Sequence, residues 1–162
     1  MKKILLTAVN AKYIHSNLAV YSLRAYAREL KENIVLAEYT INNRTEYILR
    51  EIYLKKPDVI CFSCYIWNIS IILEVAEEFH KLCPKVPIWV GGPEVSYEVE
   101  AFLKEHPFIT GVIIGEGEKT FSELCRYYVK GEGGLEEMKG IALFDGAGNV
   151  QIHESQEILD MN

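Results

Sequence analysis

Five short apolar runs, each followed by a segment with helical periodicity, constrain the fold of this chain more than any other feature. The runs occupy residues 3–9, 33–39, 58–64, 86–92 and 109–118. Most of them are apolar at nearly every position, as parallel strands covered on both faces are. The alternation therefore predicts an α/β fold in which a parallel sheet carries helices on both faces.

The segments between the runs carry apolar residues at helical spacing. Helices are expected over residues 17–31, 44–55, 69–83, 95–103 and 121–128. In the second of these, the spacing directs Ile48, Leu49, Ile52 and Tyr53 toward the core. We predict a doubly wound, five-stranded parallel sheet of the flavodoxin-like or Rossmann-like kind, with strand order 2-1-3-4-5.

The chain changes character after residue 130. A Gly- and Glu-rich loop is followed by two short apolar segments around Asp145-Gly146-Ala147-Gly148, which predict a β-hairpin. We therefore expect an α/β domain over residues 1–130. Residues 131–162 are expected to form a loop, the hairpin and the start of a linker to a further domain.

Charge and composition narrow the classes of protein. The net charge is −6, and this excess of acid argues against a nucleic-acid surface. The chain has no apolar run of about 18 residues, so no membrane span is expected, and its first apolar stretch is too short for a signal peptide. Four cysteines without a secretory signal predict free thiols and a cytoplasmic location.

Cys61 and Cys64 have the C-x-x-C spacing of redox and metal sites. In a strand, however, residues three apart point to opposite faces. A redox cysteine is expected at a helix N-terminus, and zinc needs two further ligands that the sequence does not place nearby. We therefore interpret the pair as the end of a strand, with Cys61 in the core and Cys64 at the rim of a ligand cleft.

Ligands of doubly wound sheets bind beyond the carboxyl ends of the strands. Polar and aromatic groups follow the first strand, where Asn10, Tyr13 and His15 lie. Gly91 and Gly92 end the fourth strand without side chains, which permits a flat ligand to approach the backbone. The Gly-Glu-Gly-Glu segment at residues 115–118 opens a helix.

The sequence lacks the motifs of several common ligand sites and active sites. The loop after the first strand has no glycine, which argues against a flavin phosphate loop and a dinucleotide fingerprint. Asn10 and Ser63 stand where a response-regulator receiver has acidic residues. The chain also has no P-loop and no G-x-S-x-G nucleophile elbow.

Three motifs, in order, resemble a known family. They are FSCYIWN at residues 62–68, VGGPEVSY at 90–97 and GEGEKTFSEL at 115–124. Together they look like the cobalamin (vitamin B12)-binding domain that precedes the radical S-adenosylmethionine domain in many anaerobic bacterial proteins. Relatives of this kind are often labelled magnesium-protoporphyrin IX monomethyl ester oxidative cyclases.

The resemblance implies a cofactor site at the carboxyl edge of the sheet. It places Ser63 near the nucleotide tail of cobalamin, Gly91 and Gly92 against the corrin or its tail, and residues 115–118 at the border of the tail pocket. Relatives with an axial histidine carry D-x-H-x-x-G after the first strand, and His15 does not match that pattern. The predicted cofactor-binding residues are Asn10, Tyr13, His15, Ser63, Cys64, Tyr65, Trp67, Gly91, Gly92, Pro93, Glu94, Gly115, Glu116, Gly117 and Glu118. No catalytic residue and no metal ligand is predicted.

The resemblance also implies that the chain is the cobalamin-binding module of a larger enzyme. The C-x-x-x-C-x-x-C signature is absent, so S-adenosylmethionine and a four-iron four-sulfur cluster are expected only in a downstream catalytic domain. That enzyme would carry out methyl transfer or related radical chemistry on a small molecule.

Two alternatives stay open: a degenerate domain that serves as an assembly surface, and an independent small-molecule enzyme using Cys64 or His15. A bulky residue in place of Gly92 is expected to block the ligand without unfolding the sheet.

Overall fold

A computed structural model of the chain describes residues 1–11 and 18–153. Its strands form one sheet in the order β2-β1-β3-β4-β5-β6-β7. The first five strands are parallel and follow the predicted order 2-1-3-4-5, which confirms the expected fold. The strands are β1 (Ile4–Asn10), β2 (Ile34–Thr40), β3 (Val59–Ser63), β4 (Ile88–Gly91), β5 (Gly111–Ile113), β6 (Ile141–Phe144) and β7 (Val150–Ile152).

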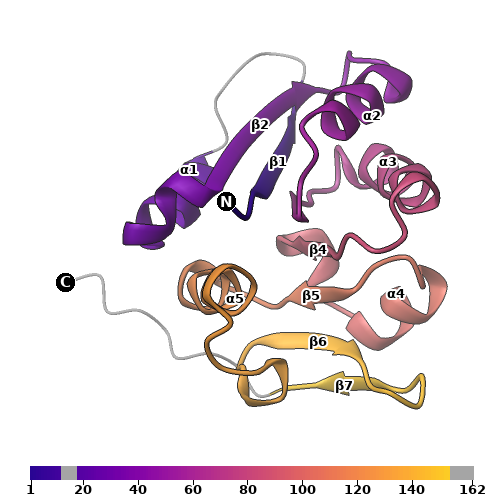
Figure 1. The fold of residues 1–162 in the computed structure, drawn as a ribbon. Helices are drawn as coiled ribbons and strands as arrows, with labels where there is room; N and C mark the ends of the chain where they lie inside the picture. The colour runs from indigo at the N-terminus through magenta and orange to yellow at the C-terminus, as the bar shows by residue number, and fades with distance from the viewer. Residues whose placement is uncertain (12–17, 154–162) are drawn as a thin grey trace.

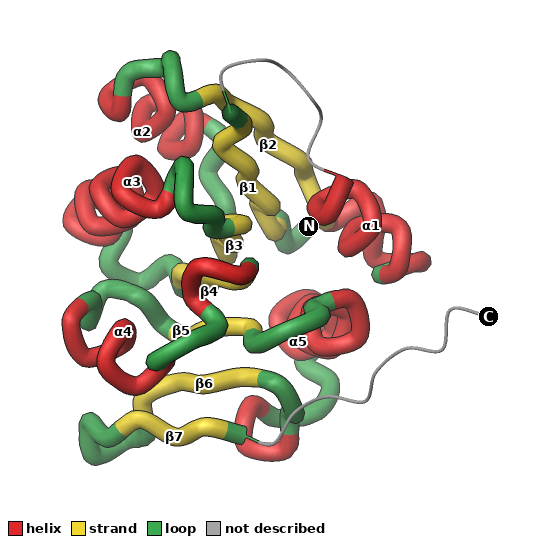
Figure 2. Tube along the Cα trace, turned by 180° about the vertical axis from the view of Figure 1, so that it is seen from behind, coloured by secondary structure: helices red, strands yellow, loops and turns green. Residues whose placement is uncertain are grey.

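Helices cover both faces of the sheet (Figure 1). They are α1 (Leu18–Tyr26), α2 (Thr45–Leu54), α3 (Ile69–Leu82), α4 (Val99–Glu105) and α5 (Glu118–Lys130), with short 3₁₀ helices η1 (Arg28–Asn33), η2 (Pro93–Val95) and η3 (Leu135–Glu137). Helices α1 and α5 lie on one face, and α2, α3 and α4 lie on the other, as the reverse view also shows (Figure 2). Within the described ranges, no helix is both long and apolar enough to cross a membrane.

The predicted hairpin is present, and it extends the parallel sheet. Strand β6 pairs antiparallel with β5, and β7 pairs antiparallel with β6. The Asp145 carboxylate orders the connecting turn by accepting hydrogen bonds from the backbone N–H groups of Ala147 (2.8 Å) and Asn149 (2.9 Å). The segment after residue 130 therefore shares a sheet with the parallel strands, while the expected linker from residue 154 lies outside the described residues.

Three helix predictions were wrong in detail. The helix expected from residue 95 begins only at Val99, because Val95 belongs to η2 and Glu98 adopts a left-handed backbone (φ 48°). The first helix ends at Tyr26, because Arg28 adopts a left-handed backbone (φ 53°) and the chain continues as η1, which buries Leu30. In α2, Ile48 and Ile52 are buried, whereas Tyr53 is 48% exposed. The side chain at 53 lies about 100° around the helix from Ile52, beyond the narrow stripe that contacts the sheet.

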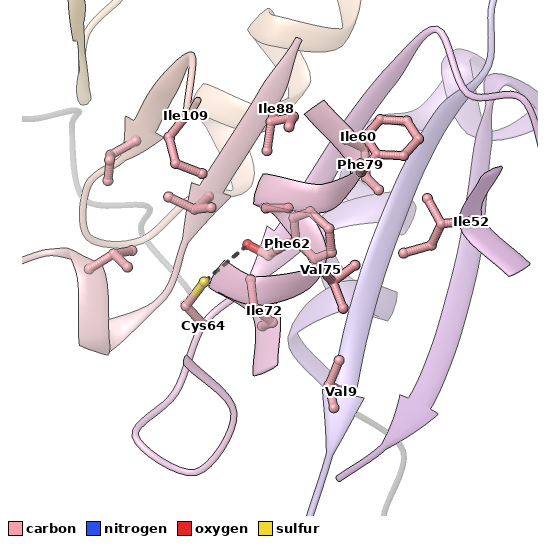
Figure 3. Packing of buried hydrophobic residues seen from close by; sticks show 14 of the residues in the cluster. Val9, Ile52, Ile60, Phe62, Cys64, Ile72, Val75, Phe79, Ile88 and Ile109 are labelled. Carbon is pink, nitrogen blue, oxygen red and sulfur yellow. Dashed lines mark hydrogen bonds between the residues drawn. The ribbon is translucent and has the colours of Figure 1, made fainter. Parts of the chain in front are cut away.

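Each face of the sheet packs against its own apolar cluster. The cluster beneath α2, α3 and α4 includes Phe62, Ile72 and Phe79, and it also contains Cys64 (Figure 3). The cluster beneath α1 and α5 includes Leu6, Cys61, Trp89 and Phe121 among others. Alternation along β3 therefore assigns the two cysteines to opposite faces, as expected from the geometry of a strand.

Candidate functional site

A cavity of about 460 Å³ lies on the α1/α5 face of the sheet. Its walls come from α1 and α5, and its floor comes from the middle strands. The loops that follow β3, β4 and β5 surround its mouth, so it opens at the carboxyl edge of the sheet. This is the edge where ligands of doubly wound sheets bind.

The register of the strands explains why the face is hollow there. Leu6, Cys61 and Trp89 are neighbours across β1, β3 and β4 and form one row of side chains. The next row toward the carboxyl edge consists of Ala8, Ser63, Gly91 and Ile113. Three of the four residues in this second row are small, so the helices above it leave space that side chains do not fill.

Trp89 forms the floor of the cavity and is fully buried. Its indole lies where Gly111 has no side chain, since a Cβ at Gly111 would come within 2.4 Å of the ring. The indole N–H donates a hydrogen bond to the Tyr128 hydroxyl at 2.9 Å. A missing side chain on β5 and a hydroxyl on α5 therefore fix the largest side chain of the floor.

The mouth is shaped by a serine that links two loops. The Ser96 hydroxyl donates to the Gly92 carbonyl at 2.9 Å and accepts from the Gly115 N–H at 3.3 Å. Ser96 thus joins the loop after β4 to the loop after β5. Glu116 in the second loop and Glu118 at the start of α5 continue the rim.

Asn68 organises the loop after β3. This side chain is fully buried, accepts a hydrogen bond from the Tyr65 N–H (2.8 Å) and donates to the carbonyls of Val9 (2.9 Å) and Ser63 (3.2 Å). It thereby joins the carboxyl ends of β1 and β3 beneath the loop. The sequence signal was an asparagine directly before a helix, where a cap is expected, but its bonds reach two strands and not the first turn of α3.

The two cysteines of the C-x-x-C lie in different environments. Cys61 lines the cavity floor, whereas Cys64 is fully buried in the opposite cluster, with its sulfur 4.0 Å from the Phe62 carbonyl oxygen (Figure 3). Burial raises the pKa of Cys61 to about 12 and also raises the pKa of Cys64, where the nearby Glu94 charge adds to the effect. Both thiols are therefore protonated at neutral pH, and neither is poised as a nucleophile.

The structure brings most of the predicted site residues together. Those that line the cavity are Ser63, Tyr65, Gly91, Gly92, Pro93, Gly115, Glu116, Gly117 and Glu118. Asn10, Cys64, Trp67 and Glu94 do not line it. Tyr13 and His15 lie outside the described residues.

The four predicted residues that do not line the cavity lie in different surroundings. The Asn10 side chain donates to the Glu38 carboxylate at 3.3 Å. Trp67 stacks on Tyr65, with ring centroids 4.5 Å apart, beside the mouth. Glu94 is exposed to solvent at the start of the loop after β4. Cys64 was expected at the rim, but its side chain faces the core because it continues the alternation of β3.

Sequence reasoning missed the deep part of the cavity. Leu6 and Leu23 line it with Cys61, Trp89 and Phe121, and their pattern is that of ordinary core residues. The register of the strands could have grouped Leu6, Cys61 and Trp89, but nothing in the sequence shows that the space beside them stays empty.

The expectation for Gly92 was wrong. Gly92 has φ 109°, and a Cβ there would come within 2.3 Å of the Cys64 carbonyl oxygen. A side chain at Gly92 would therefore strain the backbone and push against the chain directly after β3 instead of filling the ligand space. A Cβ at Gly91 has its nearest contacts 3.5 Å away, on Ile113, so Gly91 is the position from which a side chain can fill the cavity.

The described residues give no candidate metal centre. Across residues 1–11 and 18–153, no three His, Cys, Asp or Glu side chains gather as metal ligands. The chemistry of the site is that of a slot with an apolar floor and a polar rim.

Comparison with known proteins identifies a family for this chain. The model of the B12-binding domain family matches residues 4–125. TokK of Streptomyces tokunonensis, a cobalamin-dependent radical SAM methyltransferase, is 38% identical over 69 residues, which are 43% of this chain and 10% of that protein. The hopanoid C-3 methylase of Methylococcus capsulatus (Bath) is 26% identical over 123 residues, which are 75% of this chain and 24% of the methylase.

A solved structure shares the fold. The cobalamin-dependent S-adenosylmethionine radical enzyme OxsB, with aqua-cobalamin and S-adenosylmethionine bound, superposes with a TM-score of 0.77 at 20% identity, over 98% of this chain and 23% of OxsB. The chain thus spans a tenth to a quarter of the length of these relatives. Since the family model matches well over half of its residues, the chain belongs to the B12-binding domain family.

Proposed function

We propose that this chain binds cobalamin and holds the nucleotide tail of the cofactor in the cavity between α1 and α5. The observation that carries the proposal is the row of small residues Ala8, Ser63 and Gly91 at the carboxyl edge of the sheet, of which Ser63 and Gly91 line the cavity. A cavity of about 460 Å³ suits the nucleotide tail and not a whole cobalamin, so the corrin ring would lie outside the mouth.

The residues present fit the parts of such a cofactor. The apolar floor around Trp89 suits the base of the tail, and the Ser63 hydroxyl with Glu116 and Glu118 offers hydrogen-bond partners to the sugar. The Tyr65–Trp67 stack beside the mouth offers an aromatic surface to the macrocycle. Contacts from Asn10, Tyr13, His15 and Glu94 stay predictions, and Cys64 is expected to contribute backbone only.

We infer further that the chain is one domain of a longer enzyme. When bound, cobalamin supplies a cobalt centre that carries a methyl group. The residues described here would bind the cofactor, orient it and exclude water from its tail. A downstream domain would hold S-adenosylmethionine and a four-iron four-sulfur cluster, and together the domains would methylate a small molecule in the cytoplasm. Relatives several times longer than this chain support the proposal of a further domain. The four free cysteines of this chain support the cytoplasmic location.

The two alternatives make different predictions. An enzyme based on the Cys64 thiol is not favoured, because the raised pKa keeps that thiol protonated in the core. A degenerate domain without cofactor would fold and bind no corrinoid. Titration of the purified chain with hydroxocobalamin, followed by absorbance and calorimetry, separates the degenerate domain from the binding module.

Gly91→Val provides the structural test of the site. Its added methyl groups would enter the cavity, so we expect cobalamin affinity to fall about tenfold or more, with little change in melting temperature. Gly146→Val is the matched control, because a Cβ at Gly146, in the hairpin turn, meets nothing within 4 Å. A folded wild-type chain that binds no cobalamin, or a Gly91→Val chain that binds normally, would contradict the proposal.

A further inference from the structure

We infer that the cavity selects the base of the cofactor tail, accepting an apolar benzimidazole and discriminating against a purine. Corrinoids occur with either kind of base on the same corrin ring, so this choice defines which cofactor the chain can use. The inference rests on the proposed function, and it concerns the floor of the cavity rather than its mouth.

Among the residues that the structure describes, the floor offers no free side-chain hydrogen-bonding group of ordinary strength. Leu6, Leu23 and Phe121 present only carbon. The indole N–H of Trp89 already donates to Tyr128. The remaining polar atom is the Cys61 sulfur, which burial keeps as a neutral thiol and which hydrogen-bonds weakly.

Every stronger polar side chain that lines the described cavity lies at its mouth. Ser63 is the last residue of β3, and the others come from the following loops and the first turn of α5. They are Ser63, Tyr65, Ser96, Tyr97, Glu116 and Glu118. Ser63 is two residues beyond Cys61 along the strand, a separation of about 7 Å. The sugar of a tail can therefore reach polar partners that its base, lying over Cys61 and Trp89, cannot reach.

An apolar floor beneath a polar mouth disfavours binding of a corrinoid whose base is adenine. Adenine carries an amino group and several ring nitrogens, and each loses hydrogen bonds to water when it enters the floor. Dimethylbenzimidazole instead presents two methyl groups and a fused hydrocarbon ring, which gain by leaving water. We expect the chain to bind the benzimidazole corrinoid about tenfold or more tightly than the adenine one.

Three corrinoids test the inference on the wild-type chain. The dissociation constants of cobalamin, adeninylcobamide and the tailless cobinamide are measured by calorimetry. Cobalamin is expected to bind most tightly. Equal affinity for cobalamin and adeninylcobamide would overturn the inference while leaving corrinoid binding intact. Absence of binding by all three would overturn the proposed function itself.

A matched pair of thiol variants tests whether the cavity floor causes the preference for cobalamin over adeninylcobamide. Cys61→Ser places a hydroxyl in the floor and is expected to narrow the preference for cobalamin about threefold or more. Cys125→Ser makes the same change at a buried thiol of the same cluster that does not line the cavity, and the preference should remain.

Leu23→Gln is a second cavity variant, which tests the inference if Cys61→Ser does not fold. Leu23 is half-buried on α1 and lines the cavity, so an amide there adds a polar group at less cost to the core. A preference that stays unchanged in both cavity variants, or that narrows equally in Cys125→Ser, would overturn the assignment of selectivity to the floor.

Discussion

Both faces of the sheet carry an apolar cluster, but the candidate cofactor cavity lies on only one of them. Beneath α2, α3 and α4, side chains such as Phe62, Ile72 and Phe79 are buried in one apolar cluster, and we call this the filled face (Figure 3). Beneath α1 and α5, a cavity of about 460 Å³ remains. We attribute this cavity to the small side-chain volume of one row of the sheet, which contains Ala8, Ser63 and Gly91.

The C-x-x-C motif spans this difference. Cys61 faces the cavity and Cys64 faces the filled side, although the two are only three positions apart. A single strand thus builds a binding site with one set of its side chains and a stabilising core with the other. Substitutions of the same type on the two faces should therefore have different effects.

The largest difference is expected between two phenylalanines. Phe79→Ala on the filled face should lower the free energy of unfolding by about 4 kcal/mol, because the variant leaves a new void. Phe121→Ala should cost about 1 kcal/mol less, because Phe121 already borders empty space and has fewer contacts to lose. Urea unfolding measures both, and a cost for Phe121 that equals or exceeds that for Phe79 would break the comparison.

Alkaline pH should destabilise the protein through thiols on both faces. The folded-state pKa of Cys61 is raised from 9.0 to about 12, and that of Cys64 is also raised. Below pH 9 both folded and unfolded states keep the protons, so stability does not depend on these groups. Above pH 9 the unfolded thiols ionise first, and the free energy of unfolding should fall by about 1 kcal/mol per thiol for each further pH unit.

Single substitutions separate the two contributions to this slope. Cys61→Ser and Cys64→Ser should each make the decline in stability between pH 9 and 10 shallower than in the wild type, as measured by urea unfolding across that range. If Cys61→Ser keeps the full wild-type dependence of the free energy of unfolding on pH, the Cys61 thiol ionises in the folded protein as it does in the unfolded one. Water would then reach the cavity floor, and Cys61 would not be buried as the structure shows.

The smallest effect concerns the rate of thiol labelling. Cys83 is half-buried and should react first with a small alkylating reagent, followed by Cys61 through the cavity and last by Cys64. Mass spectrometry of the labelled chain gives the order. Added cobalamin should slow labelling of Cys61 and leave Cys83 unchanged. Labelling of Cys64 at the rate of Cys61 would show that the filled face is open.

Much of the fold could be predicted from the sequence, because strands and helices follow local patterns. The five apolar runs became β1 to β5 in the expected order, and the Asp145 turn became a hairpin. The errors fell where packing overrides pattern. Arg28 takes a left-handed conformation that ends the first helix, and Tyr53 lies outside the stripe that α2 buries.

The site was only partly predictable. The sequence by itself determined the parallel sheet, the loops at its carboxyl edge and the small residues Ser63 and Gly91, since these depend on short-range patterns of polarity and size. Only the tertiary structure decided that Gly92 supports the backbone at Cys64, that Cys61 and not Cys64 faces the cavity, and that Trp89 forms its floor. An empty space is a property of several elements packed together: it depends on strand register and helix position, and no local segment encodes either one.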